Sequence, residues 1–263
     1  MLDSNAASSA QLDPLAVARE YLTPAGRRRV LRQPKVDLPR TDLSIPHGQG
    51  HLAVRYWGDG QPILLVHGWA SDQSDLFSYV PALAVSGYRV ITMDLPAHGE
   101  SSGDCASIDQ LADGILTVAR HFDPLKAIVG HSVGSAAATV AISKGLAVEK
   151  AVFLAPPESY ENFARYFAAI KGLSPQQVDQ MIEHLQAIGV RVSITTSDLA
   201  SAFDLPGLII HSIDDPITAV ENSLVIAGKW VNSIFLPVSD LGHRGILRDQ
   251  NVITTVCDFI SKE

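Results

Sequence analysis

The sequence has few cysteines, no long apolar run and no excess of basic charge, and each shortage excludes a class of protein. Its two cysteines, Cys105 and Cys257, are too few for a disulfide framework, and neither lies in a C-x-x-C motif. The longest apolar runs have the length of a strand and fall well short of the ~20 residues that a membrane helix needs. The formal net charge of −8 argues against a nucleic-acid-binding protein.

The beginning of the sequence carries no targeting signal. Residues 1–13 are polar and have neither a basic region nor an apolar core, so we expect no signal peptide. The densest basic stretch, residues 27–29 with Arg32 and Lys35, is not followed by an apolar segment, and we interpret it as a solvated edge. With so few cysteines, these features predict a cytoplasmic protein. The oligomeric state is left open.

The order of strand-like and helix-like segments predicts the fold class. We expect residues 1–25, rich in Ala, Ser and Asp, to be flexible, and residues 26–263 to form one domain. Alternating polar and apolar residues at 42–45 and 52–57 predict a leading antiparallel ribbon. Apolar runs predict buried strands at residues 62–66, 88–93, 125–129, 150–154, 205–211 and 233–238. Because helix-length segments separate these strands, we predict an α/β fold, a mostly parallel twisted sheet with helices on both faces.

Residues 157–204 interrupt the alternation because they contain only helical patterns. The second helix of this stretch has a clear start, with Ser174 as N-cap, Pro175 in the first turn and Gln177 three residues after the cap. The insertion leaves the carboxyl end of a predicted strand, where open α/β sheets bind ligands. We therefore predict a small helical lid. The alternative is a pair of extra helices that only pack on the sheet.

The segment 129–134, Val-Gly-His-Ser-Val-Gly, contains the pattern G-x-S-x-G between a predicted strand and a predicted helix. This context is typical of a nucleophile elbow, a sharp turn that lifts the hydroxyl of Ser132 clear of the sheet. Gly130 and Gly134 would relieve contacts that a Cβ would create. The following helix would offer free backbone N–H groups, and that of Val133 could stabilise an oxyanion.

A serine is a weak nucleophile until a base takes its proton and a third group orients the base. The elbow thus predicts a carboxylate and a histidine further along, each at the end of a later strand. Asp214 and Asp215 follow the strand at 205–211, and His243 follows the last strand. A second oxyanion donor should come from the loop after the strand at 62–66. Gly68 would let that loop turn the N–H of Trp69 toward the serine.

The chain resembles the α/β-hydrolase superfamily from about residue 40 to its end, and in particular the serine esterase-like branch. Four motifs in order carry the likeness: residues 67–69 (His-Gly-Trp), 94–101 (Asp-Leu-Pro-Ala-His-Gly-Glu-Ser), 130–134 (Gly-His-Ser-Val-Gly), and Asp215 with residues 242–243 (Gly-His). The resemblance implies Ser132 as nucleophile, Asp214 or Asp215 as acid and His243 as base, with the 94–101 loop bracing the site. The sequence departs from many relatives at Ser135, where they have a second glycine.

Between the two aspartates we choose Asp215. The residues after it, Pro216, Ile217 and Thr218, resemble the turn that follows the acid in related hydrolases. Pro216 also favours an extended backbone at the residue before it. Because neighbouring side chains of an extended segment point to opposite sides, only one aspartate can reach His243.

These features predict a serine hydrolase that cleaves carboxylic esters of small to medium apolar acyl groups through an acyl-enzyme on Ser132. The substrate would be a small-molecule ester, and we expect no metal or organic cofactor. Two alternatives stay open: an acyltransferase with the same triad, and a non-catalytic binding protein on this fold. The sequence does not separate esters from thioesters or from C–C bonds as substrates.

Overall fold

A computed structural model describes residues 12–25, 34 and 39–262 of the chain. The arginine-rich stretch, residues 27–29 with Arg32 and Lys35, lies outside the described residues, as do residues 1–11 of the segment that we predicted to be flexible.

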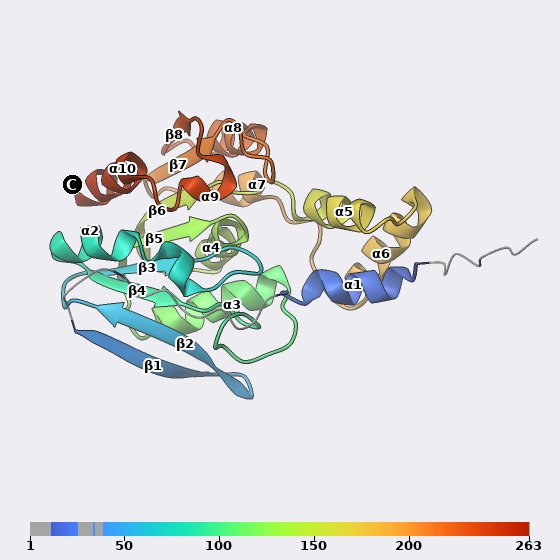
Figure 1. Cartoon of the computed structure of the whole chain (residues 1–263), viewed down its shortest axis with the longest axis horizontal. Coiled ribbons are helices and arrows are strands. Elements are labelled where there is room, and N and C mark those ends of the chain that lie inside the picture. Colours follow the sequence, from blue (N-terminus) through green and yellow to red (C-terminus); the bar gives the residue numbers. More distant parts are fainter. Residues whose placement is uncertain (1–11, 26–33, 35–38, 263) are drawn as a thin grey trace, which may run out of the picture.

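One eight-stranded sheet forms the centre of the molecule (Figure 1). Its strand order is β1-β2-β4-β3-β5-β6-β7-β8; β1, β2 and β4 pair antiparallel in turn, and all other pairs are parallel. The strands are β1 (Arg40–His47), β2 (Gly50–Trp57), β3 (Pro62–Val66), β4 (Arg89–Met93), β5 (Leu125–His131), β6 (Val148–Leu154), β7 (Gly207–Ser212) and β8 (Ser233–Val238). The predicted fold class and the leading antiparallel ribbon are confirmed.

Helices cover both faces of this sheet, which is why its central strands are apolar on both sides. On one face, α2 (Tyr79–Val85) and α10 (Gln250–Ser261) pack against side chains such as those of Ile63 and Leu65. On the other, α3 (Ile108–Ala119) and α4 (Val133–Ser143) pack against alternate residues such as Leu64. The shorter elements are η1 (Gln73–Leu76), α7 (Thr196–Ala200), α8 (Glu221–Lys229) and α9 (Gly242–Gly245).

Three helices form a separate group beside the sheet: α1 (Pro14–Leu22), α5 (Tyr160–Ile170) and α6 (Pro175–Ala187) (Figure 1). The predicted capping box of α6 is present, with Ser174 and Gln177 each bonding to the other's backbone N–H. The interpretation of residues 157–204 as a lid stays a prediction.

Residues 14–22 differ from the flexible segment that we predicted for residues 1–25. They form α1, which Asp13 caps by accepting a hydrogen bond from the N–H of Leu15 at 3.0 Å, with Pro14 in its first turn. Val17, Ala18, Tyr21 and Leu22 are buried. Such a short helix is marginal alone, so packing against α5 and α6 stabilises it, and a local pattern does not reveal those partners.

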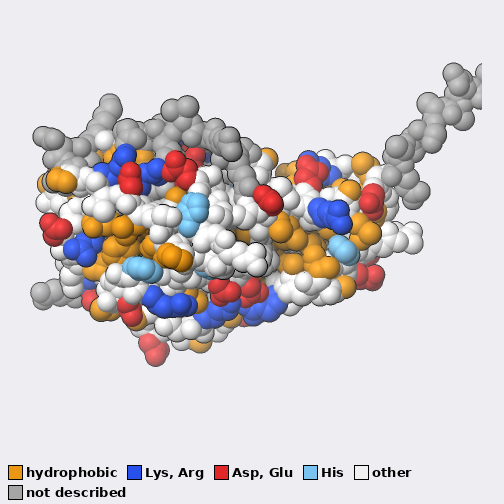
Figure 2. Space-filling view, turned by 90° about the horizontal axis from the view of Figure 1, so that it is seen from below, with side chains coloured by type: hydrophobic (Ala, Val, Ile, Leu, Met, Phe, Trp, Pro, Cys, Tyr) orange, Lys and Arg blue, Asp and Glu red, His pale blue; other side chains and the backbone are white. Residues whose placement is uncertain are grey.

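Charged side chains of both signs lie next to one another on the face shown in Figure 2. Elsewhere opposite charges are paired directly, as in Arg191 with Asp109 and in Lys144 with Asp113 at 2.9 Å. Among the described residues, no helix is both long enough and apolar enough to span a membrane.

Candidate active site

Ser132 occupies a sharp turn between β5 and α4. Its backbone has φ 52° and ψ −126°, a region that residues with a side chain rarely adopt. The turn is held in place because the N–H of Ser132 donates to the carbonyl of Leu154 in β6 at 2.9 Å. This geometry is that of a nucleophile elbow, in which the serine side chain stands at the carboxyl edge of the sheet.

The two glycines of the motif are required by close approaches of the backbone. A Cβ on Gly130 would lie 2.7 Å from the Cα of Ser135, and one on Gly134 would lie 2.7 Å from the carbonyl oxygen of Val66. Both distances are shorter than a real Cβ tolerates. Ser135, the departure noted above, is fully buried, and its hydroxyl donates to the carbonyl of Gly130 at 2.8 Å. It therefore adds a hydrogen bond across the elbow.

The structure brings His243 and Asp215 together. The Nδ1 of His243 lies 2.7 Å from Oδ2 of Asp215, whose side chain is fully buried. Because the carboxylate accepts, Nδ1 carries the proton of the neutral ring, and this assignment follows from the hydrogen-bond network. Nε2 is then left as an acceptor, the state that a general base needs.

The carboxylate of Asp215 accepts hydrogen bonds from several sides. Oδ1 accepts from the N–H groups of Ile217 at 2.8 Å and Thr218 at 3.0 Å, and Oδ2 also lies 3.2 Å from Nε2 of the buried His211. Burial by itself would raise the pKa of Asp215, but the hydrogen bonds from His211, His243 and the Thr218 backbone outweigh it and hold the pKa well below its ordinary value. Asp215 is thus ionised throughout the neutral range.

Asp214 has a different position. It is exposed and accepts from the hydroxyl of Ser212, and its Oδ2 accepts from the N–H of Gly242 at 3.2 Å. The Ser212 hydroxyl, together with nearby backbone N–H groups, lowers the pKa of Asp214. Asp214 therefore braces the loop that carries His243 and does not touch the imidazole.

Ser132 and His243 reach the same edge of the sheet without being joined in this state. Within the described part of the chain, no hydrogen bond links the hydroxyl of Ser132 to His243. The link runs instead through the neighbouring His131, whose Nε2 lies 3.0 Å from the backbone carbonyl of His243. Catalytic hydrogen bonds are often long in a protein without substrate, so their working roles stay predictions.

The loop after β3 lies directly against the elbow. A Cβ on Gly68 would be 3.1 Å from the Cβ of Ser132, tighter than most such contacts, so glycine lets this loop approach the elbow closely. Buried His67 fixes the loop, because its Nε2 accepts from the N–H of Leu95 at 3.0 Å and its Nδ1 then donates to the carbonyl of Gly68 at 2.7 Å. The N–H groups of Trp69 and Val133 remain the predicted oxyanion donors.

The 94–101 loop supports this arrangement from behind. The carboxylate of fully buried Asp94 accepts from the N–H groups of Gln73 at 2.8 Å and Glu100 at 2.9 Å. Asp94 therefore ties its own loop to η1, the element that follows the His67–Trp69 loop. No three His, Cys, Asp or Glu side chains of the described residues come together as metal ligands.

Comparison with known families agrees with this geometry. The model of the alpha/beta hydrolase family matches residues 63–231, which include the elbow and Asp215. The chain belongs to the alpha/beta hydrolase family.

Three similar proteins place this hydrolase among relatives of differing activity. The dihydrolipoyllysine-residue acetyltransferase component of the acetoin cleaving system of Pseudomonas putida is 42% identical over 83 residues, covering 29% of this chain and only 21% of that protein. A non-heme haloperoxidase of Rhodococcus erythropolis is 25% identical over 234 residues, 69% of this chain and 85% of the relative. An esterase structure from Pyrococcus furiosus, 18% identical with a TM-score of 0.71, covers 91% of this chain and 97% of the esterase, and it shows the fold alone.

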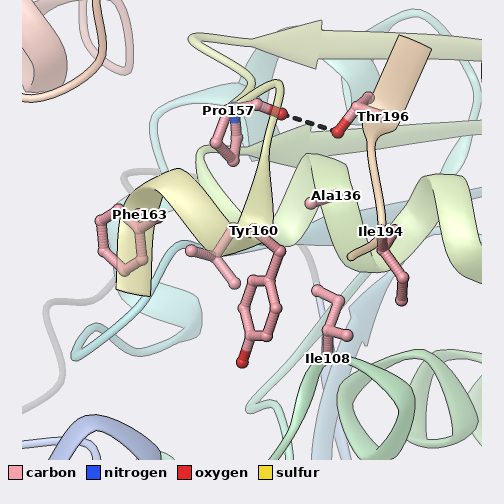
Figure 3. A pocket seen from close by; sticks show the side chains of 8 residues that line it. Ile108, Ala136, Pro157, Tyr160, Phe163, Ile194 and Thr196 are labelled. Atoms are coloured by element: carbon pink, nitrogen blue, oxygen red, sulfur yellow. Dashed lines mark hydrogen bonds between the residues drawn. The ribbon is translucent and has the colours of Figure 1, made fainter. Parts of the chain in front are cut away.

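A small apolar cavity lies beside the start of α4, next to the elbow (Figure 3). Val133, the residue after Ser132, forms part of its wall, and α5 contributes Tyr160 and Phe163. Its remaining lining residues are Ile108, Ala136, Pro157, Ile194 and Thr196. The volume of about 10 Å³ holds roughly one water molecule. An acyl group on Ser132 would therefore meet an apolar and narrow site.

Two histidines of the site were not predicted as members of it. His211 contacts the carboxylate of Asp215, and its ring is held by the hydroxyl of Ser223 and the carbonyl of Thr218, each at 2.7 Å. His131 contacts the backbone of His243. His131 could have been noticed, because it is the residue before the nucleophile. His211 has no comparable signal, because its contacts depend on how the loop after β7 folds back.

His131 should make this hydrolase sensitive to acid. Burial, reinforced by repulsion from protonated His243, lowers the pKa of His131 to about 3. An unfolded chain binds the proton near the ordinary value of ~6.5, so stability is intact above that pH and is lost as the pH falls toward 3. Because of His131, we expect the free energy of unfolding to be about 2 to 3 kcal/mol lower at pH 4.5 than at pH 7.

Urea unfolding of wild type and the His131→Gln variant at both pH values measures this cost. Between pH 7 and pH 4.5, the free energy of unfolding of the variant should fall by about 2 to 3 kcal/mol less than that of wild type. His121→Gln, at an exposed position, is the control and should behave as wild type. Equal acid sensitivity of wild type and His131→Gln would contradict a neutral buried His131.

Proposed function

We propose that this protein is a serine hydrolase that cleaves carboxylic esters of small to medium apolar acyl groups. The observation that carries the proposal is the hydrogen bond of 2.7 Å between His243 Nδ1 and Asp215, at the sheet edge where Ser132 has its left-handed backbone. A base oriented by a buried carboxylate, at the same sheet edge as a partly exposed elbow serine, is the arrangement that acyl transfer requires.

In the proposed reaction, Oγ of Ser132 attacks the ester carbonyl carbon while Nε2 of His243 takes the hydroxyl proton. The N–H groups of Val133 and Trp69 stabilise the resulting oxyanion. The bond to the alcohol then breaks, and His243 gives its proton to the leaving oxygen. Water attacks the acyl-enzyme, loses a proton to His243 and releases the acid, and Ser132 regains its proton.

The cavity beside Val133 supports the proposed acyl preference. Its lining is almost entirely apolar, and its volume of about 10 Å³ is far smaller than a long acyl chain. We therefore expect kcat/KM for p-nitrophenyl esters to be highest for acetate to butanoate and to fall at least ~10-fold by decanoate, since each poorly fitted methylene costs about 1 to 3 kcal/mol. A steady rise of kcat/KM toward decanoate would contradict the proposed acyl preference.

The likeness to an acetyltransferase component keeps acyl transfer as the second candidate. An acyltransferase would pass the acyl group from Ser132 to an alcohol or a thiol instead of to water. Adding an alcohol during turnover separates the two activities. A hydrolase releases mainly free acid in dilute alcohol, whereas a transferase releases mainly the new ester and turns over faster. A non-catalytic binding protein would cleave no ester and would not react with a fluorophosphonate.

A further inference from the structure

The aromatic side chain of Tyr21 in α1 packs against α5. The ring of Tyr21, 3% exposed, lies 5.7 Å from that of Tyr160, 6.2 Å from Phe163 and 5.5 Å from Phe167, centroid to centroid. Buried aromatic rings in such tilted contacts contribute strongly to packing. Polar contacts flank the ring, because Lys171 pairs with Glu20 and the amide of Gln177 donates to the carbonyl of Leu12 at 2.8 Å.

Two of the side chains that Tyr21 contacts are walls of the cavity beside the nucleophile. Figure 3 shows Tyr160 and Phe163 projecting from α5, with Ile108 beside Tyr160. Phe167 contacts the same ring of Tyr21 but lies one turn further along α5 and does not line the cavity. Tyr21 thus contacts the α5 wall without lining the cavity itself.

The end of α1 also reaches the facing wall. The carbonyl of Leu22 accepts a hydrogen bond of 2.9 Å from the N–H of Ala106, two residues before Ile108. Ile108 begins α3 and lines the cavity opposite α5. Helix α1 therefore joins the two walls, α5 and the start of α3, and holds them at a fixed separation.

We propose that Tyr21 is a specificity-determining residue, which holds α5 against the cavity and so limits the length of the acyl chain that Ser132 accepts. This inference rests on the proposed ester hydrolysis and names what sets its substrate range. With a cavity of about 10 Å³, a long acyl chain enters only if a wall moves. The start of α5 is held by the hydrogen bond of 3.2 Å from the N–H of Tyr160 to the carbonyl of Ile194, and the rest of α5 packs chiefly on α6 and α1.

The hydroxyl of Tyr21 supplies a matched control. It is buried and faces the Tyr160 hydroxyl, and burial followed by the interaction with Tyr160 raises the pKa of Tyr21. Within the described residues it makes no hydrogen bond of ordinary length. The contacts that hold α5 are therefore chiefly those of the ring. Tyr21→Phe keeps those contacts, whereas Tyr21→Ala removes them.

The test is the ratio of kcat/KM for p-nitrophenyl octanoate to that for the acetate in the full-length chain. We expect Tyr21→Ala to raise this ratio at least ~10-fold, mainly through a lower KM for octanoate. The wider cavity would bind roughly one or two more methylene groups of the octanoyl chain. Tyr21→Phe should leave the ratio within ~2-fold of wild type. Phe167→Ala removes one ring contact of Tyr21 without changing a residue that lines the cavity, so it should shift the ratio in the same direction as Tyr21→Ala. It replaces Tyr21→Ala in the test if that variant does not fold.

An unchanged ratio in folded Tyr21→Ala or Phe167→Ala, with wild type cleaving acetate, would overturn the inference and leave the proposed function intact. A wild-type protein that cleaves no ester and takes up no fluorophosphonate would overturn the proposed function, and the inference would fall with it. A change in stability alone, with the ratio constant, would also contradict a role in specificity.

Discussion

Replacing Ser132 by alanine is expected to lower the rate of ester hydrolysis at least ~10³-fold, the scale seen when one member of a catalytic triad is removed. The loss should fall on kcat, because the serine oxygen forms the bond that defines the reaction. The fold should survive, since the hydroxyl makes no hydrogen bond within the described residues and alanine has the same backbone preferences at φ 52°. Initial rates with p-nitrophenyl acetate measure the effect.

Ser135→Ala is the matched control for this variant. It makes the same substitution one turn further along, at a buried serine whose hydroxyl bonds only to the carbonyl of Gly130. We expect it to retain activity within ~10-fold, because one lost hydrogen bond is worth about 1 kcal/mol. Most of the wild-type rate in pure Ser132→Ala protein would exclude Ser132 as the nucleophile.

Asp215→Asn is expected to lower kcat by ~10⁴. The amide oxygen of the new side chain would be fixed by the N–H groups of Ile217 and Thr218, which now bond to Oδ1. Its NH₂ group would then take the place of Oδ2 and face Nδ1 of His243. Nδ1 would have to accept, so Nε2 would carry the proton and could not take one from the serine.

Asp214→Asn tests the choice between the two aspartates. Its Oδ1 accepts from the Ser212 hydroxyl and its Oδ2 from the N–H of Gly242. An amide can keep its oxygen on the N–H of Gly242 and turn its NH₂ group toward the Ser212 hydroxyl, so we expect a loss of less than ~10-fold. Steady-state kcat of the two variants, measured with one ester, gives the comparison. If Asp214→Asn proved the more damaging, the acid of the site would be Asp214.

Features that depend on local sequence could be predicted before the fold was seen. The strand, the G-x-S-x-G turn and the helix around Ser132 occur as expected, because the turn pattern and the apolar run before it are local in sequence. The demand on Gly130 is also local, whereas Gly134 is required by residues 66 and 67 of the neighbouring strand and loop. The choice of Asp215 also rested on a neighbour, Pro216, and the structure places Asp215 against His243. The roles of these residues in catalysis remain predictions.

Features that depend on distant partners could not be predicted. Residues 14–22 have the composition of a loose terminus, and only the aromatic side chains of α5, almost 140 residues later, give Tyr21 a buried site. In the sequence, His211 likewise belongs to the apolar run that predicts a strand. Its contact with Asp215 exists because the loop after β7 returns to that strand. Tertiary packing decides both cases, and no short pattern encodes it.

The most direct test of the central claim is to identify the residue that a fluorophosphonate modifies. We expect one phosphonyl group per chain by intact mass, located by peptide mapping on Ser132, present in Ser135→Ala and absent in Ser132→Ala. Modification of another residue, or an unmodified wild-type protein that still hydrolyses esters, would contradict a nucleophilic Ser132.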